Sequence, residues 1–244
     1  MALAFDAASG SSAGAGGTTL TYSHTTSGSN RGLFVGAGCL DSITAPTIPG
    51  VTYGGTPMSA AGSALADVAT PNIEVRATGW TLIAPASGAN NVIVTYSASG
   101  AEVGSCAVSF ADVNQTDMDG TPATASANTA TTPATVDASS AADEIVVDFV
   151  YTAQDTVAAG AGQTSRNEQE NINFESSCGS STETGAATTT MSWTMGAAGL
   201  GNFWAIVAVP IKPVAASSAP TLSAATVTSI GDTTATPRVT ITFP

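Results

Sequence analysis

The sequence carries little charge, and what it carries is mostly of one sign. Only 9% of the 244 residues are charged, against about 25% in a typical soluble domain. Acidic residues number 18 and basic residues five, which gives a formal net charge of -13 without any basic cluster. Such a chain repels nucleic-acid phosphates and anionic membrane surfaces. We therefore predict that neither a nucleic acid nor a membrane is its partner.

Long hydrophobic runs and targeting signals are also missing. The longest apolar run, residues 203–211, contains Pro210 and is too short to span a bilayer. The first residues lack a basic start, and their apolar run breaks at Asp6, so they do not show the pattern of a secretory signal. We expect the protein to be made in the cytoplasm of its host, with export by an unconventional route as the alternative.

Cysteine is scarce. Cys39, Cys106 and Cys178 are odd in number and show no C-x-x-C spacing, so no zinc site is indicated. The first two lie in apolar, strand-like segments, where buried thiols are common. Cys178 lies in a Ser/Gly-rich stretch and is expected to be exposed. Three free thiols from a reducing cytoplasm are favoured over a disulfide.

The chain is rich in strand signals. Segments of Val, Ile, Thr and aromatic residues recur between clusters of Gly, Pro, Ser and Asn, a spacing typical of all-β sandwiches and barrels. We predict an all-β fold over residues 1–213. The predicted architecture is an antiparallel two-sheet β-sandwich, jelly-roll-like, with about ten strands.

Two segments predict how the core strands pack. In residues 31–40 one face carries the apolar side chains of Leu33, Val35, Ala37 and Cys39. Gly36 and Gly38 lie on the opposite face, where they leave room for another backbone or a bulky ring. Residues 203–211 are apolar in both phases, so they predict a central strand that is covered on both sides.

Acidic residues occur beside one clear strand pattern. In residues 143–151 one face carries Ile145, Val147, Phe149 and Tyr151. Glu144 and Asp148 fall on the other face, which we expect to meet solvent. Asp143 with Glu144, or Glu168 with Glu170, are candidates for the two carboxylates of a glycosidase. That chemistry depends on a separation that sequence does not supply, so adjacent surface carboxylates are the favoured interpretation.

A change of composition marks the end of the sandwich. Residues 214–220 are rich in Ala and Ser and end in proline, which indicates a linker. Residues 221–244 resemble the opening of a fibronectin-type-III or Ig-like module. We expect this C-terminal β extension to add strands to a neighbouring subunit. The alternative is the remainder of a longer product.

His24 is the only histidine, and Ser23, Ser27 and Ser29 lie close to it in sequence, with Asp41 further along. No G-x-S-x-G elbow occurs, and proximity in sequence does not assign a base role to one histidine. A turn-capping or packing role is therefore favoured over a hydrolase built on His24.

Residues 114–120 (Asn-Gln-Thr-Asp-Met-Asp-Gly) faintly resemble a calcium loop. The EF-hand pattern requires glutamate six residues after the glycine, and position 126 is Ser126. The match therefore fails, and a solvated loop is favoured. The sequence also has no phosphate loop and no dinucleotide fingerprint. We predict no cofactor, no metal and no catalytic residue.

Two features could form contacts with partners. Trp80, Trp193 and Trp204 could stack on sugar rings, but each occupies a strand position that favours core packing. Residues 163–178 are polar and predict an exposed strand or a contact loop. The possible partner-contact residues, which include three in the C-terminal extension, are Gln163, Arg166, Asn167, Gln169, Asn171, Val239, Ile241 and Phe243.

Several motifs together carry a resemblance to a known domain type. They are residues 23–35 (Ser-His-Thr-Thr-Ser-Gly-Ser-Asn-Arg-Gly-Leu-Phe-Val), 51–58 (Val-Thr-Tyr-Gly-Gly-Thr-Pro-Met), 83–88 (Ile-Ala-Pro-Ala-Ser-Gly), 92–95 (Val-Ile-Val-Thr) and 108–116 (Val-Ser-Phe-Ala-Asp-Val-Asn-Gln-Thr). Residues 18–213 resemble a β-sandwich domain that recurs in structural proteins of tailed phages and in bacterial surface proteins. The resemblance brings no active site to transfer. The structural-motif residues are His24, Asn30, Arg31, Tyr53, Gly54 and Gly55.

The resemblance implies a structural domain of a virion or a cell surface. We predict a non-enzymatic structural protein of a tailed-bacteriophage virion, either a capsid decoration (cement) protein or a tail or fibre component. Its expected partners are other virion structural proteins and its own copies, in a homo-oligomer. The alternative is a glycan-binding adhesin or carbohydrate-binding module on a phage or bacterial surface, with a host-surface glycan as its ligand.

Overall fold

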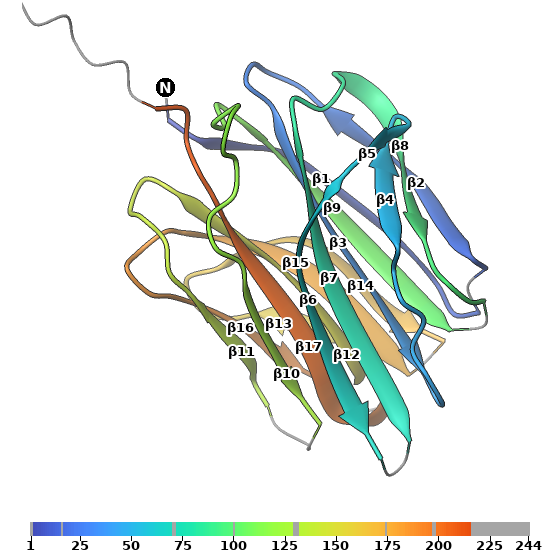
Figure 1. Cartoon of the computed structure of the whole chain (residues 1–244). Helices are drawn as coiled ribbons and strands as arrows, with labels where there is room; N and C mark the ends of the chain where they lie inside the picture. The colour runs from blue at the N-terminus through green and yellow to red at the C-terminus, as the bar shows by residue number, and fades with distance from the viewer. Residues whose placement is uncertain are drawn as a thin grey trace, which may run out of the picture. The chain divides into compact units, whose positions relative to one another are not determined.

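A computed structural model describes residues 2–15, 17–69, 72–99, 101–128, 132–173, 175–196 and 199–215. The described residues form 17 strands in four open sheets, and every strand pair is antiparallel (Figure 1). The predicted all-β, antiparallel class is confirmed. The predicted linker lies outside the described residues from position 216 on, as does the whole extension 221–244 with Val239, Ile241 and Phe243.

The first half of the chain builds two sheets. Inner sheet I has the order β1 (Ala4–Ala13), β9 (Glu102–Ala111), β3 (Gly32–Asp41), β7 (Ile73–Ile83) and β6 (Ser59–Val68). Outer sheet I has the order β2 (Thr19–Thr26), β8 (Gly88–Thr95), β4 (Gly50–Tyr53) and β5 (Thr56–Pro57).

The second half builds two more sheets. Inner sheet II has the order β10 (Ala123–Ala127), β17 (Gly199–Ile211), β12 (Ile145–Gln154), β15 (Ser176–Thr184) and β14 (Thr164–Ile172). Outer sheet II has the order β11 (Ala134–Ala138), β16 (Thr189–Met195) and β13 (Val157–Ala159). The two outer sheets lie on opposite sides of the molecule in Figure 1.

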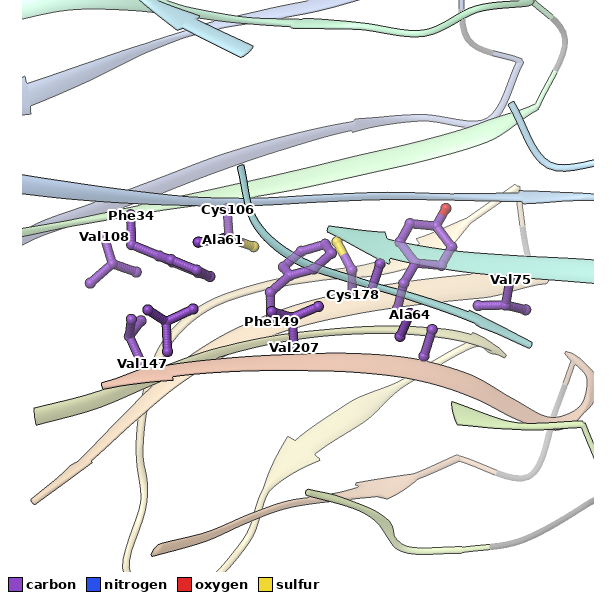
Figure 2. Packing of buried hydrophobic residues seen from close by; sticks show 14 of the residues in the cluster. Phe34, Ala61, Ala64, Val75, Cys106, Val108, Val147, Phe149, Cys178 and Val207 are labelled. Carbon is purple, nitrogen blue, oxygen red and sulfur yellow. The ribbon is translucent and has the colours of Figure 1, made fainter. Parts of the chain in front are cut away.

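Three hydrophobic cores order the sheets into layers. One core joins outer sheet I to inner sheet I, through residues such as Val35 and Val94. The central core joins the two inner sheets, and Figure 2 shows Phe34 and Phe149 in it. The third core joins inner sheet II to outer sheet II, around Trp193. The predicted single two-sheet sandwich of about ten strands is therefore wrong: two sandwiches pack face to face.

Strands at the middle of this stack are covered on both faces. In β17, Val207 and Val209 pack in the central core, whereas Ile206 and Ala208 pack in the third core. This burial confirms the prediction for residues 203–211 and explains why that segment is apolar in both phases. A strand between two cores presents no face to solvent.

The glycines of β3 allow the inner sheets to approach closely. A Cβ atom on Gly38 would lie 2.6 Å from Cδ2 of Tyr151, and a Cβ atom on Gly36 would overlap the ring of Phe149. The expectation that Gly36 and Gly38 make room for bulky rings is confirmed. Their lack of a side chain lets β12 place two aromatic rings against the backbone of β3.

The two halves follow the same strand order. If β1 to β4 are matched with β10 to β13, and β6 to β9 with β14 to β17, both inner sheets have one order and the outer sheets agree except for β5. Across the central core, β3 lies against β12, β9 against β15, β7 against β17, β1 against β14 and β6 against β10. This pairing is what an approximate twofold axis between β3 and β12 produces.

Two burial predictions are wrong. Asp148 is fully buried instead of solvent-facing, because outer sheet II covers the face of β12 that carries it together with Val146 and Val150. Cys178 is buried instead of exposed, because β15 is an inner strand whose face meets the central core. The three cysteines are free, which confirms the predicted thiols.

Candidate functional site

His24 lies inside the first sandwich. Its side chain is 2% exposed, and its Nδ1 atom lies 2.8 Å from Oγ of Ser9 on β1. The ring of Tyr53 packs edge-on against it, with centroids 6.2 Å apart. Burial lowers the pKa of His24 to about 4, and the nearby Asp6 opposes this shift only in part. The imidazole is therefore neutral near pH 7.

The hydroxyl beside His24 is not one of the three that sequence proximity suggested. Ser23 points to the solvent side of β2, whereas Ser27 bonds to Asp6 through both its backbone N–H and its Oγ. A histidine next to a serine is the beginning of nucleophilic chemistry. Here Nε2 of His24 is buried, and none of the described residues forms a hydrogen bond with it.

Asp6 ties the turn after β2 to inner sheet I. Its Oδ2 atom accepts a 2.8 Å hydrogen bond from the Ser27 backbone N–H and another of 2.8 Å from Oγ of Ser109. Burial alone would raise the pKa of Asp6, but these bonds from Ser27 and Ser109 together lower it. The carboxylate thus stabilises the polar turn that leads into β3.

Arg31 and Asn30 shape the same turn. Arg31 donates from Nε to the carbonyl of Pro85 and from Nη1 to the carbonyl of Gly28, both at 2.9 Å. Asn30 has a positive φ of 47°, a conformation that asparagine tolerates better than most residues. Arg31 thus holds the turn by hydrogen bonds to two loop carbonyls.

Tyr53 and the two glycines after it anchor outer sheet I. The Tyr53 hydroxyl donates toward the carbonyls of His24 and Gly88, at 3.1 and 3.0 Å. Gly54 and Gly55 have φ values of 54° and 82°, which suit the tight turn between β4 and β5. The structural-motif residues from His24 to Gly55 therefore lie in one region and fix turns and sheet packing there.

Four of the residues predicted as partner contacts, Arg166, Asn167, Gln169 and Asn171, lie on β14, an edge strand, and Gln163 directly precedes it. The Arg166 guanidinium stacks over the Phe5 ring at 3.8 Å and donates from Nε to Thr182 Oγ1 at 2.8 Å. Gln169 lies within hydrogen-bond range of Ser12, at 3.5 Å. These contacts join β14 to β1, the edge of the other inner sheet. Their use by a partner stays a prediction.

The other predicted contacts that the structure describes also have partners within the chain. Asn167 accepts a 2.9 Å hydrogen bond from Gln169 Nε2. The exposed Asn171 has a positive φ of 54° and donates its backbone N–H to the carbonyl of Asp155. Gln163 is half-buried and points inward, where its Nε2 donates to Ser181 Oγ at 2.6 Å and its Oε1 accepts the Ser192 N–H at 2.6 Å.

Gln163 also lies close to Asp148, with 3.5 Å between its Nε2 atom and Oδ2 of the carboxyl group. Asp148 is the buried residue that was predicted to face solvent. Trp193 donates from Nε1 to Oδ2 of Asp148 at 2.6 Å, and Ser181 donates from its backbone N–H and its Oγ to Oδ1 at 2.8 Å. Burial raises the pKa of Asp148 to about 7 in spite of these hydrogen bonds, which favour the ionised form. Val146 and Val150, on the same face two residues away, were the sequence signal for burial.

The remaining carboxylates considered for chemistry have local roles. Glu144 accepts the Ala141 N–H at 3.0 Å, and Glu170 accepts the Val157 N–H at 3.2 Å. Asp117, in the loop that resembles a calcium loop, pairs with Lys212 at 2.6 Å. In the parts of the chain that the structure describes, no group of three or more His, Cys, Asp or Glu residues is placed to hold a metal ion.

All three tryptophans are buried. Trp193 is fully buried, and Trp204 and Trp80 are 5% and 8% exposed. The preference for core packing over surface stacking is therefore confirmed. Trp80 also lines a cavity.

Comparisons of this chain with protein-family models, curated proteins and solved structures find no match. Within the described ranges, no helix has the length and hydrophobicity needed to cross a membrane.

Proposed function

We propose that this protein is a non-enzymatic structural component of a tailed-bacteriophage virion, either a capsid decoration (cement) protein or a tail or fibre component. Its partners are other virion structural proteins and copies of itself, and it resides in the virion. The observation that carries this proposal is the uncharged outward face of outer sheet I.

The outward side chains of outer sheet I are exposed or half-buried, and none is charged, although the chain has 18 acidic residues. They form a flat surface of mostly hydroxyl and amide groups on three paired strands. They are Thr19, Thr21, Ser23, Thr25, Thr52, Asn91, Ile93 and Thr95. We name this surface the uncharged face.

A surface of this kind suits a subunit that neighbours cover. The cores of protein interfaces are depleted of charged residues, because burying an unpaired charge costs far more than burying a hydroxyl group. Side chains on a sheet are also held in fixed rows, so a neighbour meets a pre-organised surface. These properties support packing into an array, with the few charges elsewhere on the molecule.

The proposal is tested on particles. Phage particles made in the presence of the tagged protein are banded on a density gradient, and the bands are analysed by mass spectrometry. The protein is expected in the particle band at a fixed stoichiometry, and it should remain there after a high-salt wash because the uncharged face depends little on ion pairs. A monodisperse monomer that never bands with particles would contradict the proposal.

We also propose that each sandwich belongs to the jelly-roll class. The order β1-β9-β3-β7 in inner sheet I and β2-β8-β4-β5 in outer sheet I supports this assignment, because it is the order that two Greek keys wound over two sheets produce. An experimental structure that traces these connections tests it.

The glycan-binding alternative rests on one observation, the exposed polar side chains of β14, which include Glu168, Glu170 and Asn171. Trp193 and Trp204 are buried and give it no support at the surface. A glycan array probes this alternative, and an array without hits would remove it.

A further inference from the structure

A cavity of about 450 Å³ opens beside the last two strands of inner sheet I. Strands β6 and β7 form one wall, and the loop between β3 and β4 forms the other. Its lining residues are Thr47, Ile48, Ala60, Gly62, Ser63, Arg76, Thr78 and Trp80. The volume falls in the range of small-ligand sites, which is roughly 300–1,000 Å³.

In the second half of the chain, β15 corresponds to β7 by strand order. There Trp193 of β16 packs on Gly179 of β15, where an added Cβ atom would lie 2.6 Å from Cη2 of the indole. Gln163 bridges the same two strands by its hydrogen bonds to Ser181 and Ser192. Side chains of outer sheet II thus cover β15, whereas Trp80 of β7 lines the cavity of the first half.

Arg76 is the charged group of this cavity. Its side chain leaves β7 on the face opposite to Val75 and Ala77, which pack in the central core. Within the described part of the chain Arg76 has no hydrogen bond or ion pair, and its Nε atom is buried without an acceptor. Arg31 and Arg166 both donate hydrogen bonds, so Arg76 differs from its counterparts.

The acidic residue nearest in sequence makes no ion pair with Arg76 in the described part of the chain. Glu74 accepts the backbone N–H of Ala45 at 3.0 Å. A guanidinium group that is half withdrawn from water and lacks an acceptor gains from any anion that reaches it. A carboxylate fits best, because its two oxygens match the planar fork of an arginine side chain.

Apolar groups line the space next to Arg76. The Trp80 indole is fixed in orientation because its Nε1 donates to Thr78 Oγ1 at 3.0 Å. Ile48 adds an aliphatic surface, and both side chains are almost completely buried. The exposed Thr47 and Ser63 lie among the lining residues and bring hydroxyl groups. A ring with one apolar side and several hydroxyl groups complements this arrangement.

We propose that this cavity binds a sugar acid, a hexuronate unit whose carboxylate pairs with Arg76 and whose ring packs against Trp80 and Ile48. The hydroxyl groups of the sugar face Thr47 and Ser63. This site goes beyond the structural role proposed above, because it gives the protein a small-molecule or polysaccharide ligand that assembly does not require.

The test is isothermal titration of the full chain with glucuronate, glucose and benzoate, with tryptophan fluorescence as a second readout. Glucuronate is expected to bind with a stoichiometry of one and at least tenfold more tightly than glucose, which lacks the carboxylate. It should also bind more tightly than benzoate, which lacks the hydroxyl groups. Equal binding of glucose and glucuronate, or binding of benzoate alone, overturns the proposal.

Variants at Arg76 assign the site. Arg76→Met keeps the aliphatic stem and removes the charge, so it should lower glucuronate affinity at least tenfold, whereas Arg76→Lys should retain part of it. Lys212→Met is the matched control, since Lys212 pairs with Asp117 outside this cavity. Circular dichroism verifies that each variant is folded. Undiminished binding by folded Arg76→Met overturns the proposal, and unchanged banding of that variant with particles separates this result from the structural role.

Discussion

The indole nitrogen of Trp193 donates a 2.6 Å hydrogen bond to the buried carboxyl group of Asp148. The bond joins the two sheets of the second sandwich, because Trp193 belongs to β16 and Asp148 to β12. Among the described residues, the hydrogen-bond donors to this carboxyl group are Gln163, Ser181 and Trp193, and no basic side chain pairs with it, so hydrogen bonds offset its desolvation. Its ionisation is therefore coupled to the stability of the fold.

Asp148 should make stability fall as the pH rises. Its pKa is about 7 in the folded protein, above the ordinary value of 3.8. The stabilisation that protonated Asp148 contributes to the fold is thus fully present below the ordinary pKa and is lost as the pH rises through about 7. Between pH 5 and 8 the free energy of unfolding of the native protein should fall by about 2–3 kcal/mol more than that of Asp148→Asn. Urea unfolding of both proteins across this pH range measures this difference. The same pH dependence of the free energy of unfolding in both proteins would contradict the prediction.

His24 should titrate far below the usual range for histidine. Its folded pKa is about 4, below the ordinary 6.5, so its contribution to stability is present above pH 6.5 and is lost as the pH falls through about 4. Because it is the only histidine, its ring protons give a single set of NMR signals. Those signals should not move between pH 6 and 8. A midpoint near 6.5 would show that the ring is open to water.

Position 36 of β3 should not tolerate a side chain, because Gly36 packs directly against the ring of Phe149. Gly36→Ala places a methyl group in the Phe149 ring, and overpacking of this kind costs about 1–3 kcal/mol. Gly50→Ala is the control, because nothing lies within 4 Å of a Cβ atom there. In a double-mutant cycle Phe149→Leu should recover part of the loss caused by Gly36→Ala. Strictly additive free energies of unfolding would show that the two residues are not in contact.

The strand pattern was predictable from the sequence because alternation records burial directly. The glycines of β3 and the apolar phases of β17 were placed correctly for that reason. The prediction that Asp148 faces solvent was wrong because it rested on the acidic side chain alone. Val146 and Val150 on the same face indicate a second core. A polar residue can occupy a buried face when donors such as Trp193 reach it, and sequence does not show donors from distant strands.

The relationship between the two halves was not visible in the sequence. Where β3 and β12 meet at the centre of the molecule, one strand supplies glycines and the other supplies Phe149 and Tyr151. Two similar faces that pack closely need complementary residues, small against large. Strand order was therefore retained between the halves while residue identity differs, and a search for repeated residues does not detect such a relationship.

A charge on the uncharged face should block assembly without unfolding the protein. Ile93 lies between Thr21 and Thr52 in neighbouring strands, so Ile93→Lys puts an ammonium group at the middle of that face. We expect at least a tenfold loss of binding to particles, because the charge would have to be buried unpaired. Ala98→Lys, in an exposed bend outside the strands, is the matched control and should bind normally.

Electron microscopy of particles tests the structural role most directly. Negatively stained particles are compared when they are made with the native protein, without it, and with Ile93→Lys. The account predicts added density at regular positions on the capsid or the tail with the native protein, and its loss in the other two preparations. Identical particles in all three preparations would contradict the claim that this protein is a virion component.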